Sequence, residues 1–420
     1  MSARTAVILA AASAVIFGCG SSQSFFSFEQ GEEARRKEVL ELELETGEHL
    51  LLDPGIGDVF VEVATGGEAH LQATLVASAP SADQAQAVID GYRIEILRTP
   101  IGSSVTVVGE PLELRQGRST MTLAPRVHLR ASVPEGVRLQ VATGSGSIET
   151  RGALGACDLS SGYGDVRVEG AAGRLRAETS SGSIEVLGVR GDSIELESGY
   201  GSIELSDLEA ELVRARTASG DVRARNVRGM LELHSGYGAL ELERIDGRVD
   251  ARTSSGAVQL SDCNTGPWNL LSGYGDVEVR SLRGELDVKT SSGQVLLQDF
   301  EGAARIESGY GPVAVSGVLH EIVATTTSGK VRVEALPGSR ANAAWRLRSG
   351  YGTVELELPG DFDCRLDART GYGSIESGFT IAMEAARRAS NSLFGTIGSG
   401  GRTVALETSS GDVLIRKLVR

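Results

Sequence analysis

The 420-residue sequence lacks several features that would place it in a familiar class. Positive charge is not in excess: 41 lysine and arginine residues stand against 56 aspartate and glutamate residues, a formal net charge of −15. This balance argues against nucleic acid as a partner, because the phosphate backbone is bound by clustered cations. The 54 glycines do not recur at every third position, which excludes collagen, and alternating aliphatic and charged residues argue against disorder.

Residues that could carry chemistry are also scarce. Five histidines are scattered through the chain, namely His49, His70, His128, His234 and His320. No nucleophile–base pair and no metal-ligand spacing is visible. Gly-Tyr-Gly-Asp at Asp165 and Asp276 resembles part of a calcium-binding β-roll repeat, but the second half-unit that completes the cage of oxygen ligands is missing. We therefore expect no enzyme activity, no cofactor and no metal site.

No apolar run is long enough for a membrane-spanning helix. Residues 5–18 form a run of 14 residues after Arg4, against the roughly 20 that a span needs, and they predict a signal peptide over residues 1–18. Gly18 and Cys19 end the run and resemble the lipobox at which bacterial prolipoproteins are lipidated. The resemblance implies a lipid anchor on Cys19, and Gly20 in place of aspartate implies the outer membrane. The alternative is an ordinary secretory signal with an incidental cysteine.

Residues 19–37 are rich in serine, glutamine and glutamate and predict a tether between the anchor and the fold. Phe25, Phe26 and Phe28 lie in this segment. They either dip into the lipid surface or pack on the following domain.

The rest of the chain is a repeat, anchored on the glycine of a Thr/Ser-x-Ser/Tyr-Gly motif. The anchors are Gly146, Gly164, Gly182, Gly201, Gly220, Gly238, Gly256, Gly275, Gly293, Gly311, Gly329, Gly352, Gly373 and Gly411. Most are 18 or 19 residues apart, and a fixed period of this kind is typical of a solenoid. The residue two after each anchor is aliphatic, and charges alternate with inward positions on both sides. The sequence therefore predicts an all-β protein, a parallel β-solenoid of about fourteen units, or rungs, about 4.8 Å apart.

The same register assigns the cysteines and the charges. Cys157 and Cys263 occupy inward positions that are aliphatic in other rungs, so we expect core residues with no disulfide between them. One outward row reads Arg176, Glu195, Arg214 and Glu232 in successive rungs. Stacking places these charges opposite one another, which predicts cross-strand ion pairs on a solvated face.

Tyrosine and serine alternate at the position before the anchor. The tyrosines are Tyr163, Tyr200, Tyr237, Tyr274, Tyr310, Tyr351 and Tyr372, and only Tyr372 breaks the alternation. Large and small residues also alternate four positions earlier, as in Leu159 and Ala177, so we expect the rings to pack at a corner of the solenoid. If the rings face outward instead, a row about 9.6 Å apart forms a ladder of stacking platforms suited to a polysaccharide or cell-wall chain.

The ends of the repeat are less regular. Residues 38–140 predict a β-rich section with one short helix over residues 81–92, and residues 141–373 predict the regular solenoid. Residues 374–420 predict a helix-containing insertion, helix-prone over residues 381–391, followed by a closing rung. We expect Arg416, Lys417 and Arg420 to protect the open end from edge pairing.

A family resemblance rests on three segments: the β-rich start, the entry sequence from Val133 to Leu139, and many rungs similar to Thr-Ser-Ser-Gly-Asp-Val, which residues 408–413 match in full. Together they resemble the bacterial "putative adhesin" family, a domain of unknown function with β-strand repeats. The resemblance covers nearly all of residues 38–420. It implies an envelope-associated protein without catalytic residues.

Three functions follow, in order of preference. The first is a non-enzymatic, lipid-anchored scaffold or adhesion module whose partners are the membrane and a polysaccharide or another envelope protein. The second is an envelope-stress sensor whose acidic body binds a cationic peptide. The third is a polysaccharide-acting solenoid enzyme, which the short turns disfavour.

Overall fold

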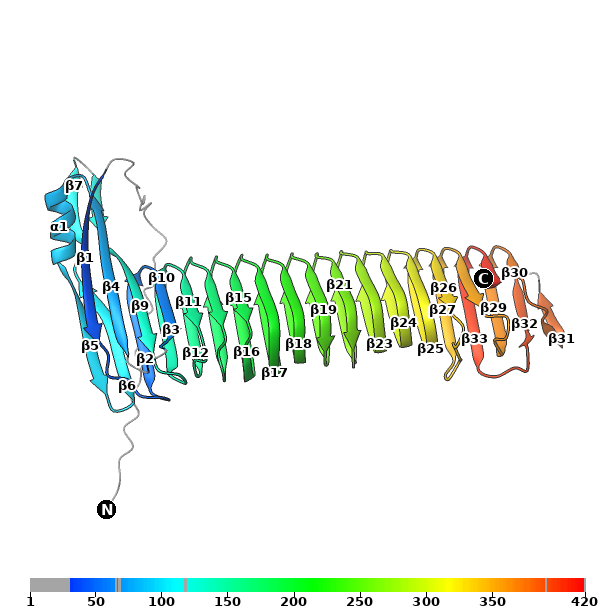
Figure 1. Ribbon diagram of the computed structural model, residues 1–420. Helices are drawn as coiled ribbons and strands as arrows, with labels where there is room; N and C mark the ends of the chain where they lie inside the picture. Colours follow the sequence, from blue (N-terminus) through cyan, green and yellow to red (C-terminus); the bar gives the residue numbers. More distant parts are fainter. Residues whose placement is uncertain (1–30, 65, 67–68, 117–118, 390, 419–420) are drawn as a thin grey trace, which may run out of the picture.

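The computed structural model describes residues 31–64, 66, 69–116, 119–389 and 391–418. The predicted signal peptide, Cys19 and the first part of the expected tether lie outside these residues. The described chain forms a rod of stacked strands with a broader N-terminal end (Figure 1). Within the described ranges, no helix is long and apolar enough to cross a membrane.

The rod confirms the predicted parallel β-solenoid. Each rung adds one strand to each of two broad faces, and equivalent residues of successive rungs pair in register, as Leu175 pairs with Ile194. About 12 turns follow one another in chain order. Their strands are β10 (Arg138–Ser145), β11 (Ile148–Arg151), β12 (Cys157–Ser161), β13 (Val166–Glu169), β14 (Leu175–Thr179), β15 (Ile184–Leu187), β16 (Arg190–Ser198), β17 (Ile203–Thr217), β18 (Val222–Ser235), β19 (Leu240–Asp246), β20 (Val249–Thr253), β21 (Val258–Asn264), β22 (Trp268–Ser272), β23 (Val277–Thr290), β24 (Val295–Ser308), β25 (Val313–Ser328), β26 (Val331–Ala335), β27 (Trp345–Tyr351) and β28 (Val354–Leu358).

The core lies between the two faces and follows from the period-2 alternation of the strands. In β14, Leu175 and Ala177 are buried while Arg176 and Glu178 are exposed. In the predicted row of charges, Arg214 Nε pairs with Glu232 Oε2 of the next rung at 2.7 Å, whereas Arg176 pairs with Glu178 of its own strand at 3.1 Å. The alternation thus specifies both the interior and the charged exterior of the rod.

The N-terminal section closes one end of the rod. Its elements are β1 (Glu32–Glu41), β2 (His49–Ile56), β3 (Val59–Val63), β4 (His70–Ala79), α1 (Ala82–Asp90), β5 (Tyr92–Thr99), β6 (Gly102–Gly109), β7 (Leu112–Gln116), β8 (Ser119–Leu123) and β9 (Arg126–Val133). Strands β2 and β3 form a rung that pairs in parallel with β10 and β11 on one side and with β6 and β9 on the other. Beyond them the pairing becomes antiparallel: β5 pairs with β6, β4 pairs with β9, and β1 pairs with β4.

Two expectations are tested in this section. The short helix is confirmed as α1, and the side chain of Ser81 caps it by accepting a hydrogen bond from the Gln84 N–H at 3.4 Å. The expected tether to residue 37 is wrong at its end, because β1 begins at Glu32. Pairing with β4 orders this segment, and Arg36 donates hydrogen bonds to the carbonyls of Ile89 and Tyr92 at 2.9 and 2.6 Å.

The last rung of the sequence is not the last rung of the rod. The C-terminal strands are β29 (Cys364–Tyr372), β30 (Ile375–Ser377), β31 (Ala382–Ala389), β32 (Ser392–Ile397), β33 (Thr403–Ser410) and β34 (Val413–Lys417). Strand β33 pairs in parallel with both β27 and β29, and β34 pairs with both β28 and β30. The final rung is therefore inserted between two rungs that precede it in the sequence (Figure 1).

This insertion corrects two expectations for residues 374–420. Residues 382–389 form strand β31 and not a helix, because antiparallel pairing with β32, which itself pairs with β29, overrides the local helical propensity. Arg416 and Lys417 do not protect an open end either, because both lie in β34, an interior strand, and Arg420 lies outside the described residues. Arg416 binds Glu355, which is 2% exposed, with Nη1 and Oε1 2.8 Å apart.

Candidate functional site

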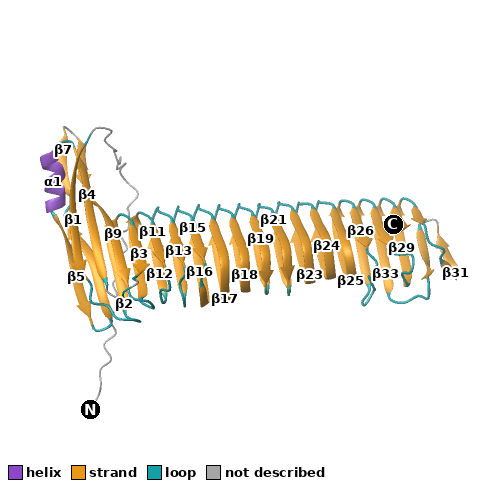
Figure 2. Cartoon of the chain, in the orientation of Figure 1, coloured by secondary structure: helices purple, strands orange, loops and turns teal. Residues whose placement is uncertain are grey.

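One edge of the rod consists of the tight turns around the anchor glycines, which form the row of short loops along the upper edge in Figure 2. We call it the tyrosine edge and define it, for each anchor from Gly146 to Gly411, as the two residues before the glycine, the glycine and the residue after it. The turns stack closely: a Cβ added to Gly164 would lie 1.9 Å from the carbonyl oxygen of Gly146. Only glycine fits this column without forcing backbones apart.

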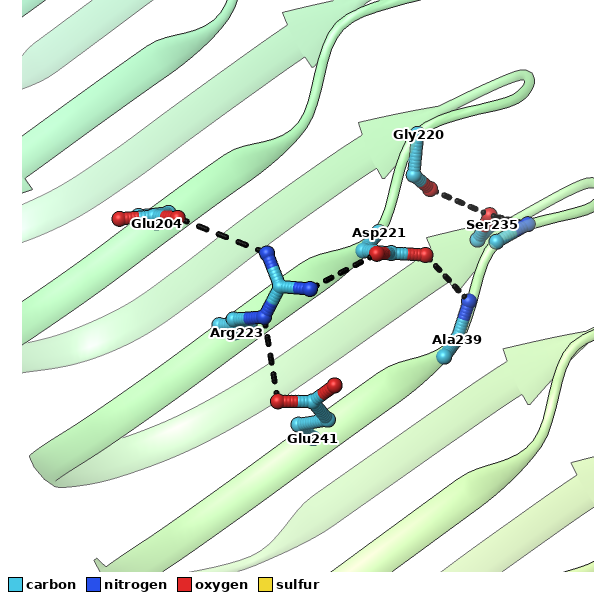
Figure 3. A network of polar contacts seen from close by, with 8 residues as sticks. Glu204, Gly220, Asp221, Arg223, Ser235, Ala239 and Glu241 are labelled. Carbon is cyan, nitrogen blue, oxygen red and sulfur yellow. Dashed lines mark hydrogen bonds and ion pairs between the residues drawn. The ribbon is translucent and has the colours of Figure 1, made fainter.

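In most rungs, a buried hydroxyl three residues before the anchor joins adjacent turns. Ser235 Oγ donates to the carbonyl of Gly220 in the preceding rung at 2.9 Å and accepts from the N–H of its own anchor, Gly238, at 2.8 Å (Figure 3). Thr253 makes the same two bonds, to the Gly238 carbonyl and from the Gly256 N–H, both at 3.0 Å. The Thr/Ser position of the motif therefore joins rungs, a role that the sequence analysis did not assign.

We expect Thr253→Val to lower the free energy of unfolding by about 2 kcal/mol, because the buried carbonyl of Gly238 and the N–H of Gly256 lose their partner. Thr290 provides the matched control. It is 6% exposed, and its Oγ1 has no hydrogen-bond partner within the described chain. Thr290→Val is expected to be neutral or stabilising. Urea unfolding monitored by circular dichroism gives both values, and equal destabilisation by the two substitutions would contradict this role of the hydroxyl.

The tyrosines do not pack in the interior. Their exposed fractions run from 68% at Tyr351 to 81% at Tyr372. The expectation that the rings cover smaller neighbours is wrong, because the position before the anchor lies at the apex of the turn, outside the inward and outward alternation of the strands. Leu159 and Ala177, from which packing was inferred, do alternate in size, but they lie in the core at 0% and 1% exposure.

The alternation of large and small residues on this edge is complete in space although it is broken in the sequence. Ser410 of the inserted rung pairs with Tyr351 on one side and with Tyr372 on the other. The order along the rod is therefore tyrosine, serine, tyrosine. At the other end Ile56, 39% exposed, takes the large position beside Ser145. The rings accordingly repeat every second rung along the whole edge, at about 9.6 Å.

The tyrosine edge carries little charge. Its charged residues are Asp165, Asp221, Asp276, Lys330 and Asp412, and it contains no arginine. The carboxylates already accept hydrogen bonds from the next rung, as Asp221 Oδ1 does from the Ala239 N–H at 2.9 Å (Figure 3). Hydrogen bonds from the backbone and hydroxyl of Ser374 hold the pKa of Asp412 below its ordinary value. These aspartates connect the turns of neighbouring rungs. The described residues contain no cluster of three potential metal ligands.

Two matches to a single family cover residues 128–281 and 243–416, well over half of the sequence, with the description Toastrack DUF4097. The chain belongs to the Toastrack family. This agrees with the resemblance on which the sequence analysis relied. No curated protein matches the sequence.

Three solved structures are similar to this chain at low identity. A putative adhesin from Bacteroides fragilis is 11% identical, with a TM-score of 0.34, over 63% of this chain and 96% of its own. A putative cell adhesion protein from Clostridium sporogenes is 10% identical, with a TM-score of 0.17, over 92% of this chain and 100% of its own. A putative lipid binding protein from Parabacteroides distasonis is 13% identical, with a TM-score of 0.23, over 71% of this chain and 96% of its own.

The broad faces of the Toastrack rod differ from its tyrosine edge because they are dense in paired charges. Arg223 contacts Glu204, Asp221 and Glu241 at 3.5, 2.8 and 3.1 Å (Figure 3). These carboxylates, Glu241 above all, raise the pKa of Arg223. Such pairs are local and solvated, so the cations of the faces are already engaged by neighbouring carboxylates.

A shallow groove of about 670 Å³ lies on one face, beside Trp268, Leu271 and Asp287. Two of its cations are already paired: Arg252 with Asp250 at 2.7 Å and Arg305 with Glu307 at 2.9 Å. Its lining contains no serine, threonine, cysteine or histidine. It lies away from the tyrosines, which are absent from its lining.

The three cysteines that the structure describes, Cys157, Cys263 and Cys364, are free and buried, and the first two occupy the inward positions that the sequence predicts. Cys157 pairs in register with Leu175, and Cys263 pairs with Leu282. Burial raises the pKa of Cys157 to about 12 and that of Cys263 to about 11. Both are thiols at neutral pH, which suits core residues and not nucleophiles.

Proposed function

We propose that this protein is a non-enzymatic, lipid-anchored scaffold of the bacterial cell envelope that binds an extended polymer along its tyrosine edge. The observation that carries the proposal is the row of seven rings, each more than two-thirds exposed and repeated in register along a rigid support. Exposed aromatic rings in a row are unusual on a soluble surface and are typical of a binding face. The anchor at Cys19, in the outer membrane, rests on the lipobox resemblance.

A cell-wall or surface polysaccharide suits this edge better than the other partners considered. Sugar rings present C–H groups that pack on aromatic faces, and the exposed tyrosine rings offer such faces at regular intervals. A cationic peptide would need free carboxylates, whereas the edge aspartates already hold backbone N–H groups. The sensor and enzyme alternatives therefore have less support than the scaffold.

The test is a triple substitution of Tyr200, Tyr237 and Tyr274 by alanine. With about 1 kcal/mol for each lost stacking contact, affinity for purified peptidoglycan should fall by about 100-fold. The rings make few contacts with the fold, so the urea unfolding midpoint should be unchanged. The measurement is a sedimentation binding assay with the soluble protein lacking residues 1–18.

The matched control replaces the exposed serines of alternate rungs, Ser181, Ser219 and Ser255, by alanine on the same edge. This variant should bind almost as the parent does. Equal loss in both variants, or unchanged binding in the tyrosine variant, would contradict a tyrosine-based site.

A further inference from the structure

We infer that the ligand of the tyrosine edge is an uncharged β-1,4-linked polysaccharide. The inference rests on the proposed function and specifies the class of polymer. Two independent observations support it: the two-rung period of the exposed rings and the near absence of cations on the edge.

The two-rung spacing of the tyrosines favours a β-1,4 glycosidic linkage in the ligand. In β-1,4-linked chains each sugar is turned over relative to the last, so the repeating unit is a disaccharide about as long as two rungs of a solenoid. The rings recur at that two-rung interval, about 9.6 Å. A β-1,4 chain lying along the edge therefore places one sugar of each disaccharide on each tyrosine, always with the same face toward the ring. Helical α-1,4 and β-1,3 chains do not keep this register over several rings.

The inserted C-terminal rung shows that the two-rung period of the tyrosines is a property of the folded surface and not of the order of rungs in the sequence. Without insertion, Tyr351 and Tyr372 would lie in adjacent rungs, about 4.8 Å apart. Insertion places Ser410 between them and extends the two-rung spacing to the end of the rod. Seven rings thus line up over twelve rung steps, about 58 Å, in a single register.

Charge excludes the anionic members of this class. The only cation on the edge is Lys330, and its Nζ already pairs with the buried Glu355. The edge aspartates would repel carboxylate, sulfate or phosphate groups on a chain. The arginines that could neutralise a polyanion, such as Arg223, lie on the broad faces in ion pairs with carboxylates.

The rigid row of tyrosines also predicts how the affinity depends on the length of the polysaccharide. Each ring contributes a weak contact, and a second contact on the same chain benefits from a high effective concentration. Affinity for β-1,4-linked N-acetylglucosamine oligomers should therefore rise several-fold with each added disaccharide from the dimer to the hexamer. A site of one or two rings would saturate at the tetramer.

The experiment measures binding of the soluble chain to four polymers and to this oligomer series by affinity electrophoresis and calorimetry. Hydroxyethyl cellulose is the neutral β-1,4 probe, and carboxymethyl cellulose is its anionic match. Laminarin and amylose test the β-1,3 and α-1,4 linkages. We expect binding to hydroxyethyl cellulose at least tenfold tighter than to the other three, with loss in the Tyr200/Tyr237/Tyr274 alanine variant.

The outcomes separate this inference from the proposed function. Equal binding to laminarin or amylose, lost in the tyrosine variant, would overturn the selection of linkage and leave the tyrosine edge as the binding face. Tighter binding to carboxymethyl cellulose would overturn the charge argument. If none of the polymers, oligomers or peptidoglycan binds, the proposed function fails as well.

Discussion

Replacing Gly238 by alanine is expected to lower the free energy of unfolding by about 3 kcal/mol or more. An added Cβ would lie 1.9 Å from the carbonyl oxygen of Gly220 and 2.3 Å from its carbonyl carbon. Both atoms are backbone, so no side-chain rotation relieves the contact, and the two rungs must separate. Separation also stretches the hydroxyl bridge from Ser235 to Gly220. Overpacking of this kind costs about 1–3 kcal/mol before any hydrogen bond is lost.

Gly66→Ala is the control. A Cβ at Gly66 would have no atom within 4 Å, and its φ is not in the left-handed region. This substitution should leave stability within about 0.5 kcal/mol of the parent. Urea unfolding followed by circular dichroism and by limited proteolysis distinguishes local from global loss, since solenoids unfold rung by rung. A Gly238→Ala protein as stable as the parent would show that the turns are not stacked this closely.

Replacing Glu355 by alanine is expected to lower the free energy of unfolding by about 3 kcal/mol. This value lies in the lower part of the range for breaking a buried ion pair, because the cationic partners, Lys330 and Arg416, both reach solvent. Glu355 is 2% exposed and lies on β28, between Lys330 of the preceding rung and Arg416 of the inserted one. Burial alone would raise its pKa. The hydrogen bond from Lys330 and the charges of Lys330, Arg416 and Arg332 outweigh burial and lower the pKa.

The sign of the pH dependence follows from this lowered pKa. The contribution of Glu355 is complete above the ordinary pKa of glutamate and is lost as the pH falls through the lower folded value. Glu355→Ala should therefore reduce the acid sensitivity of the C-terminal region. Glu376→Ala, on the exposed surface of β30, is the control and should leave the stability within about 0.5 kcal/mol of the parent.

A double-mutant cycle between Glu355 and Arg416 also tests the insertion itself. With β34 beside β28, the two residues touch and should couple by about 1 kcal/mol or more. If the rungs stacked in chain order, β30 would separate them and the coupling would vanish. Chemical denaturation of the four proteins gives the coupling energy directly.

Much of the fold could be predicted because the same pattern of aliphatic and charged residues recurs in rung after rung. A period of 18 or 19 residues, with aliphatic residues at fixed offsets, specifies parallel register, the core positions of Cys157 and Cys263, and opposite charges in neighbouring rungs. The order of the last two rungs could not be predicted, since equivalent rungs can stack in either order with the same alternation. The break at Tyr372 was the only sign of it in the sequence.

The candidate site was harder to predict for a different reason. Strand alternation decides which side chains face the core, but it does not extend to a residue at the apex of a turn such as Tyr237. The size alternation of Leu159 and Ala177 therefore said nothing about the rings. The Thr/Ser position of the motif was visible in every rung, but its role appears only when Ser235 and Gly220 are seen in adjacent layers.

The central claim is that the tyrosine edge is the binding face, and chemical nitration of the seven tyrosines, mapped by mass spectrometry, tests it most directly. In the free soluble protein we expect all seven to be labelled, as their exposure requires. With hydroxyethyl cellulose or peptidoglycan bound, consecutive tyrosines along the edge should be protected together, while Tyr92, half-buried in the N-terminal section, should be unchanged. Unchanged labelling of the edge under conditions where the polymer is bound would place the binding face elsewhere and contradict the account.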